Sequence, residues 1–185
     1  MIIGLAMLTV GLTVLFPLLG LTGLVSPTDS REVDLGSRTE VAASAGEGMS
    51  LHGTRTAELT VDDPGFLDRV LLAAPEIVQG VLILVVLTLV MRITTTLRSE
   101  EDVFVPQNTR RLYGIAAVLL VTAFLVPALE VATTTALVNG TALESAVKIG
   151  YHLSGVLVLL GFIAAALAGA FAHGTRLRAD TEGLV

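Results

Sequence analysis

The chain has 185 residues, of which 53% are hydrophobic and only 15% are charged. A water-soluble domain usually has about 25% charged residues, so this composition excludes a large soluble core. The formal net charge is −6, with no cysteine. The charge and the lack of a basic stripe argue against direct nucleic-acid binding, and the lack of cysteine excludes disulfides and cysteine-ligated metals.

Four long stretches contain no Asp, Glu, Lys or Arg: residues 1–28, 77–91, 112–129 and 149–175. A helix needs about 20 mostly apolar residues to cross the hydrocarbon core of a bilayer. The sequence therefore predicts an all-α membrane protein with four transmembrane helices, forming a single domain over residues 1–185. A small β-containing extracytoplasmic insert is expected between the first and second helices.

The first helix is predicted at Ile2–Val25, with Pro17 inside it. A signal peptide begins with a basic region and has a shorter apolar core. The chain starts without Lys or Arg, so we expect a retained anchor helix rather than a cleaved signal peptide. The missing basic flank also favours a true N-terminus upstream of this start.

The insert, residues 26–68, is rich in Gly, Ser, Thr and acids. Thr56–Val61 alternates in side-chain character with period two and contains β-branched residues, which predicts a strand. Met49–Gly53 is the partner strand that the sequence offers for a hairpin. Residues 26–75 hold nine acidic side chains against four arginines, so most of the negative charge lies there.

The remaining helices are predicted at about Phe66–Arg92 (or from Leu71), Arg111–Thr134 and Ile149–His173. Arginines concentrate in the 92–111 loop and in the 174–185 tail. Short cytoplasmic loops collect Lys and Arg. We therefore expect this loop and both termini in the cytoplasm, and the acidic insert outside.

Four ionisable side chains are expected near the outer ends of the spans: Glu76, Glu130, Lys148 and His152. Lys148 and His152 are four residues apart, so they would share one face of the predicted fourth helix. Ionisable groups at membrane depth are candidates for function. One interpretation is a small transporter, or a transporter subunit, that uses Glu76, Glu130 and His152. The alternative is that all four are interfacial residues that reach headgroups or water.

The sequence offers no catalytic signature. The three histidines lack metal-ligand spacing, and neither a nucleophile elbow nor a phosphate-binding loop is present. We expect no enzyme activity, no cofactor and no bound metal. Small residues repeat every four positions through Gly161, Ala165 and Gly169, a pattern that lets helix backbones approach closely in lipid. It favours packing within the bundle over a homo-oligomer contact.

The run from Asp102 to Leu112 resembles a recurring segment of a bacterial family of uncharacterised membrane proteins, DUF twenty-nine seventy-five. In that family a Pro/Phe segment, an Asn and an Arg-Leu pair lead into the third helix. The closing residues, Phe171–Val185, resemble the family's C-terminal Gly-x-x-Leu segment with acids and a terminal Val. The resemblance covers essentially the whole chain, and it implies a non-enzymatic protein of the bacterial plasma (inner) membrane that accompanies a cytoplasmic helix-turn-helix regulator.

The resemblance gives the cytoplasmic loop and tail a candidate role in binding a partner. The candidate partner-binding residues are Phe104, Asn108, Arg111 and Arg178. Such a surface would hold a regulatory protein or anionic lipid headgroups. The alternative is that the arginines only set the topology and that Asn108 caps the third helix.

Overall fold

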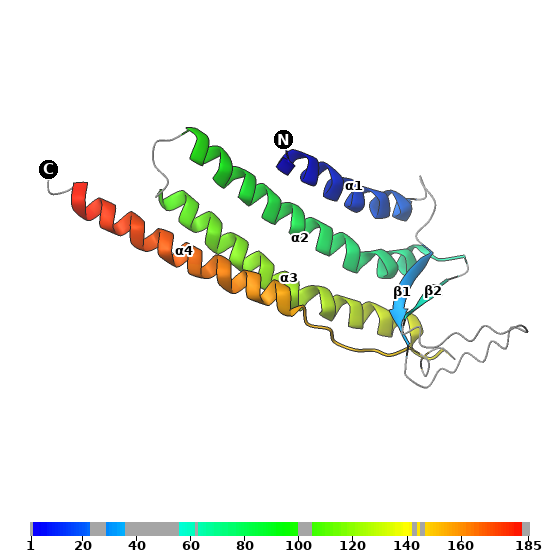
Figure 1. Ribbon diagram of the computed structural model, residues 1–185. Helices are drawn as coiled ribbons and strands as arrows, with labels where there is room; N and C mark the ends of the chain where they lie inside the picture. Colours follow the sequence, from blue (N-terminus) through cyan, green and yellow to red (C-terminus); the bar gives the residue numbers. More distant parts are fainter. Residues whose placement is uncertain are drawn as a thin grey trace, which may run out of the picture. The chain divides into compact units, whose positions relative to one another are not determined.

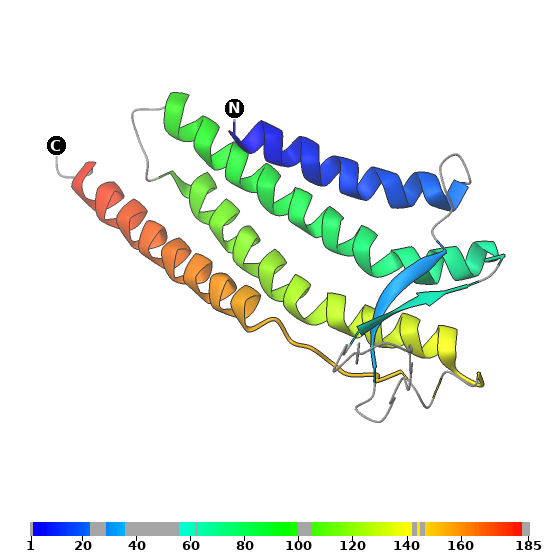
Figure 2. The same ribbon diagram turned by 45° about the vertical axis from the view of Figure 1, so that its right-hand side comes forward.

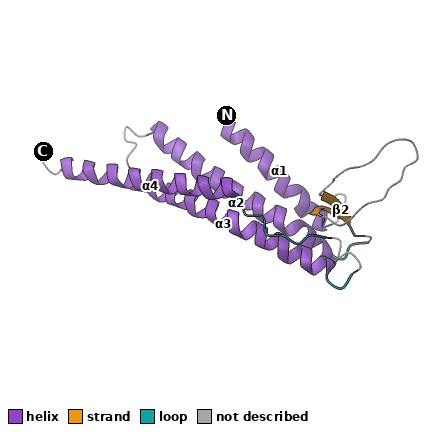
Figure 3. Cartoon of the chain, turned by 60° about the horizontal axis from the view of Figure 1, so that its bottom comes forward, coloured by secondary structure: helices purple, strands orange, loops and turns teal. Residues whose placement is uncertain are grey.

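The computed structural model describes residues 2–22, 29–35, 56–61, 63–99, 105–141, 144 and 147–182. The described chain is mostly helical and includes one small antiparallel sheet (Figures 1 and 3). The elements are α1 (Ile2–Thr22), β1 (Ser30–Asp34), β2 (Thr56–Thr60), α2 (Phe66–Ser99), α3 (Pro106–Val138) and α4 (Gly155–Glu182).

All four helices are long and apolar enough to cross a membrane, as the sequence predicted. Large apolar side chains lie exposed along them, with Leu5, Val156 and Phe162 each more than 60% exposed. Exposure on this scale is costly in water and is typical of surfaces that contact lipid. The span on α3 has the largest buried share, 33%, and the span on α1 the smallest, 11%.

The chain divides into two compact units. The helical unit comprises Met1–Leu15, Glu76–Val126 and Leu153–Val185, and the sheet unit comprises Phe16–Pro75 and Pro127–His152. In the helical unit the helices lie side by side in chain order (Figures 1 and 2). The sequence predicted one domain and did not indicate this division.

The core of the helical unit joins three helices. Ile115 and Ala116 of α3 and Ala164 of α4 are buried, and side chains of α2 such as Leu89 pack against them. A side-chain carbon at Gly161 would lie 2.8 Å from Leu120 Cγ. Glycine therefore permits the close approach of α4 to α3. The prediction that these small residues pack within the bundle is confirmed at this position.

The sheet unit contains the two strands, which pair antiparallel with Arg31 opposite Leu59 and Val33 opposite Ala57 (Figure 2). Because strand side chains alternate between faces, these four residues share one face of the sheet. Val33 and Leu59 are buried there against Val138 of α3. The other face is polar.

The strand predicted at Thr56–Val61 is confirmed as β2, but its observed partner is β1. The predicted partner, Met49–Gly53, lies outside the described residues. Three of the five side chains of β1 are charged, so the segment has little apolar content. The side chains of β1 alternate between a face that the end of α3 covers and an exposed face, and this difference cannot be recognised from the sequence of β1 alone.

Two segments that the sequence predicted as a loop and a tail are mostly helical. Most of the predicted 92–111 loop is helical, because α2 continues to Ser99 and α3 begins at Pro106. Likewise, α4 continues to Glu182 through most of the predicted 174–185 tail. The predictions followed the loss of apolar side chains. Backbone hydrogen bonds continue a helix into water without apolar residues, and proline is favourable at a first helical position.

The fourth helix also starts later than predicted. Residues 147–154 are not helical, and α4 begins at Gly155. The Lys148 backbone N–H donates to the Asp34 carbonyl at 2.9 Å, and Leu35 forms a bridge with Val147. This segment therefore pairs with the end of β1 instead of coiling. Ser154 then precedes the helix, and its Oγ accepts the Leu157 N–H at 3.4 Å, as a capping serine does.

Candidate functional site

In the helical unit, Arg111 ties the start of α3 to the end of α2. Its Nη1 donates to Asn108 Oδ1 at 3.1 Å, to the Arg92 carbonyl at 2.9 Å and to Thr96 Oγ1 at 2.6 Å. Hydrogen bonds from an ionised donor are stronger than neutral ones. We call these four residues the Arg111 cluster.

Asn108 is fully buried, with 0% of its surface exposed. It is the third residue of α3, inside the first turn, and Val105 is the residue that precedes the helix. Asn108 therefore does not occupy the cap position suggested by the sequence. A fully buried amide does not contact a partner directly, so Asn108 is a positioning residue for Arg111.

The other predicted partner-binding residues have different positions. Phe104 lies outside the described residues. Arg178 is half-buried on α4. Two further arginines of the same end, Arg110 and Arg176, are exposed. The exposed arginines, rather than Asn108, are the side chains available to a partner at this end.

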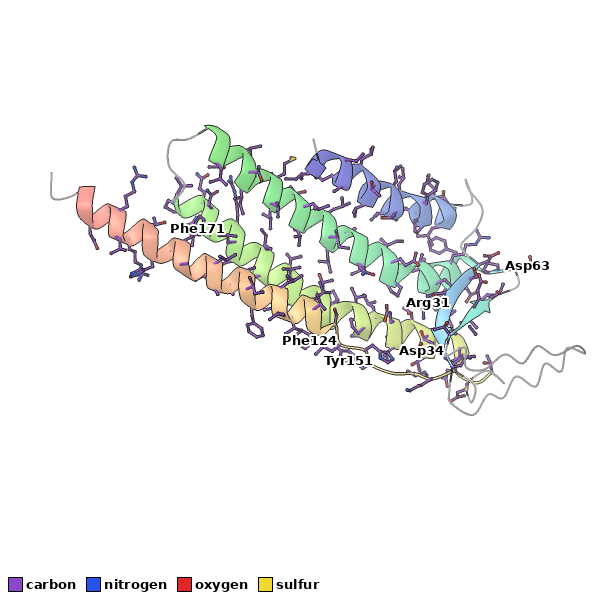
Figure 4. The ribbon with its side chains drawn as sticks, viewed as in Figure 1. Arg31, Asp34, Asp63, Phe124, Tyr151 and Phe171 are labelled. Carbon is purple, nitrogen blue, oxygen red and sulfur yellow. The ribbon has the colours of Figure 1, made fainter. Side chains whose placement is uncertain are left out.

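In the sheet unit, a second arginine anchors β1 to the end of α3. Arg31 donates from Nη1 to Thr133 Oγ1 at 2.8 Å and from Nη2 to Thr134 Oγ1. Both threonines are buried, at 5% and 9% exposure, and Thr133 itself donates to the Leu129 carbonyl at 2.8 Å. We call Arg31, Thr133 and Thr134 the Arg31 anchor; Figure 4 labels Arg31 on β1.

The Arg31 anchor was not predicted from the sequence. Arg31 joins residues that are 102 and 103 positions away, and no local spacing indicates such a pair. The sequence contains one indication of this contact. Arg31 is two residues from Val33, so the two side chains point to the same, buried face of the strand. An arginine that enters a buried face needs polar partners for its guanidinium, and adjacent threonines near the end of an apolar helix can provide them.

The intramembrane polar candidates are exposed and have different partners from those expected. Glu76, Glu130, Lys148 and His152 are all exposed. Within the described ranges, the structure shows an ion pair between His152 Nε2 and Asp34 Oδ2, at 3.1 Å, and none between Glu130 and Lys148. Since residues 148–152 are not helical, the predicted shared helix face of Lys148 and His152 is wrong.

The His152–Asp34 pair adds a third link between β1 and the segment that leads into α4. The two side chains are 61% and 39% exposed, so water screens their interaction and its contribution to stability is small. Together with the Leu35–Val147 bridge, the pair gives that segment a defined position in the sheet unit. Over the described residues, the structure contains no group of three or more His, Asp or Glu that would hold a metal ion.

Comparison with family models, curated proteins and solved structures found no match to this chain.

Proposed function

We propose that the chain is a multi-pass protein of a bacterial plasma membrane that performs no catalysis and acts as a sensor or regulatory partner. The proposed partner is a cytoplasmic helix-turn-helix regulator. The observation that carries the proposal is the distribution of buried polar side chains. Among the described residues all of them belong to α3: Asn108, Thr122, Thr133 and Thr134.

This distribution suggests that α3 connects the Arg111 cluster with the Arg31 anchor. Near its N-terminal end, Asn108 supports the Arg111 cluster, and near its C-terminal end, Thr133 and Thr134 receive Arg31 from the sheet. These hydrogen bonds are partly buried and join charged groups to buried side chains, so breaking them is costly. A ligand that displaced β1 would therefore act on α3 through the Arg31 anchor. A ligand shifts a conformational equilibrium by its difference in affinity for the two states.

The proposed orientation places the sheet unit outside and the Arg111 cluster at the cytoplasmic surface. The distribution of arginine supports this orientation, because the residues that first follow the apolar part of α2 and precede that of α3 are Arg92 and Arg111. The resemblance of residues 102–112 to the bacterial family supports the cytoplasmic partner.

The orientation is tested by labelling single cysteines in intact cells. The natural chain has no cysteine, so Ala45→Cys and Val105→Cys each provide one thiol. A membrane-impermeant maleimide should label position 45 and should label position 105 only after lysis. Labelling of position 105 from outside would reverse the proposed sides.

The regulatory role is tested by photocrosslinking from a benzophenone amino acid at exposed Gln107. We expect capture of a helix-turn-helix protein in cells, and loss of capture on Arg110→Glu. The matched control is Lys148→Glu, which makes the same charge change at an exposed site in the sheet unit and should leave capture intact. Capture of no such protein would refute the regulatory proposal while leaving the orientation unaffected.

A further inference from the structure

At one end of the helical unit, an arginine lies next in sequence to the uncharged stretch of each of three helices, α2, α3 and α4. Arg92 is the first ionisable residue after the uncharged stretch of α2, Arg111 is the last before that of α3, and Arg176 is the first fixed charge after that of α4. At this end, acidic residues come only farther along the chain from these stretches, at 100–102, 180 and 182. The charged residue that directly follows or precedes each of the three uncharged stretches at this end is therefore basic.

The structure brings the first two of these helix ends together. Arg111 Nη1 lies 2.9 Å from the Arg92 carbonyl, and exposed Arg110 is adjacent to Arg111 in the chain. Arg92 is also exposed. The guanidinium of Arg111 is held by the cluster, so it fixes the neighbouring helix ends and leaves Arg92 and Arg110 to face outward.

The helix α4 brings Arg176 to the same end of the helical unit as Arg92 and Arg110. The α4 helix runs antiparallel to α3 (Figure 1), and a side-chain carbon at Gly169 would lie 4.0 Å from Tyr113 Oη. Arg176 lies about two helical turns beyond Gly169. Two turns back from Tyr113 is Pro106, the first residue of α3, so exposed Arg176 lies near the level of Pro106, about one helical turn from Arg110.

We propose that Arg92, Arg110 and Arg176, here called the arginine collar, bind the phosphate groups of anionic phospholipids. A guanidinium donates two parallel hydrogen bonds to phosphate oxygens and keeps its charge at every physiological pH. The inference rests on the membrane placement in the proposed function. It adds a lipid partner to the end of the helical unit at which the regulatory protein is proposed to bind.

Exposed apolar side chains beside the collar favour a lipid over another anionic partner. Met91, Tyr113 and Leu177 are 38%, 49% and 54% exposed, and each lies within one helical turn of a collar arginine. A suitable partner presents negative charge and hydrocarbon in adjacent layers. A phospholipid does so, whereas a nucleic acid would leave the apolar side chains uncovered. A tyrosine at this level is also typical of the headgroup region.

The test uses the full chain with a dye on Val105→Cys, in phosphatidylcholine vesicles that contain either spin-labelled phosphatidylglycerol or spin-labelled phosphatidylcholine. Quenching by the two lipids gives their relative association with the collar. Each interfacial base should favour the anionic lipid by about fivefold at low salt. We expect Arg92→Gln, Arg110→Gln and Arg176→Gln each to reduce the preference, and the triple variant to abolish it. The Lys148→Gln control should leave it unchanged.

Equal quenching by the two lipids would overturn the inference, as would a preference that survives the triple variant. A preference that survives the triple variant would show that the three arginines do not bind the anionic lipid, and they would then be available to bind a protein partner. Resistance of the chain to carbonate extraction is measured on the same vesicles. If the chain is extracted, the membrane placement fails. If it stays inserted without a lipid preference, only the lipid inference fails.

Discussion

Replacement of Arg31 by methionine should detach the sheet from α3 without emptying the space that the arginine stem fills. Methionine keeps an unbranched apolar stem, so the change removes mainly the guanidinium. Two hydrogen bonds to the buried hydroxyls of Thr133 and Thr134 are lost.

The magnitude follows from those two bonds. A hydrogen bond to a charged group contributes about 1.5–3 kcal/mol. Two such bonds give a combined range of about 3–6 kcal/mol. Because Arg31 is only half-buried, water screens part of this interaction, and we expect a smaller loss of about 2–4 kcal/mol for local opening. At about 1.4 kcal/mol per tenfold, this corresponds to exchange of the β1 amides that is about 30-fold to 700-fold faster.

The assay is hydrogen–deuterium exchange of the full chain in lipid nanodiscs, followed on peptides that contain Ser30–Asp34. The matched control is Glu32→Gln. Glu32 is on the same strand, but its side chain is exposed on the opposite face, so its exchange should change less than threefold. If Arg31→Met has no larger effect than the control, the hydrogen bonds to α3 do not hold the sheet, and the proposed link fails.

Three further predictions concern other contacts. Glu32 and Glu58 lie directly opposite each other in the sheet. An opposite-charge pair contributes about 0.2–1 kcal/mol, so Glu58→Lys should slow amide exchange in the strands by a factor of about 1.4 to 5. Faster exchange would contradict the register. Gly161→Leu should destabilise the helical unit by about 1–3 kcal/mol through overpacking, seen as a lower thermal midpoint, whereas Gly155→Ala, where no atom lies within 4 Å, should have little effect. Pro127→Ala should slow amide exchange in α3 near residue 127, because it restores a backbone donor inside the helix; unchanged exchange there would show that the proline does not weaken the helix.

The sequence predicted the parts of the fold that depend on local composition. Apolar stretches of about 20 residues are sufficient to indicate helices that span a membrane, and period-two alternation was sufficient to indicate β2. The helix boundaries were less predictable. Arg92 and its neighbours leave the apolar span but remain helical, because the backbone hydrogen bonds of a helix continue beyond its lipid-facing side chains.

The candidate site was less predictable, because its important contacts join distant parts of the chain. The sequence marked Asn108 and Arg111 as candidates for binding a partner, whereas in the structure the two side chains are hydrogen-bonded to each other. His152 was assigned to a helix face, whereas it lies in an extended segment beside Asp34. Pairing between segments far apart in sequence leaves no periodic pattern in either segment. For this reason the sequence predicted neither the pairing of β2 with β1 nor the Arg31 anchor.

A proline lies at or beside the place where each of α1, α2 and α3 passes from one unit to the other. The boundary between the two units falls at Pro75 in α2, at Pro127 in α3 and two residues before Pro17 in α1. A proline inside a helix lacks the N–H that would bond to the carbonyl four residues earlier. Each of these helices is thus least constrained by its own hydrogen bonds where the chain passes from one unit to the other. In a protein proposed to carry a signal along α3, a helix weakened at Pro127 allows the Thr133–Thr134 end to respond to the sheet without unfolding the turns that hold the Arg111 cluster.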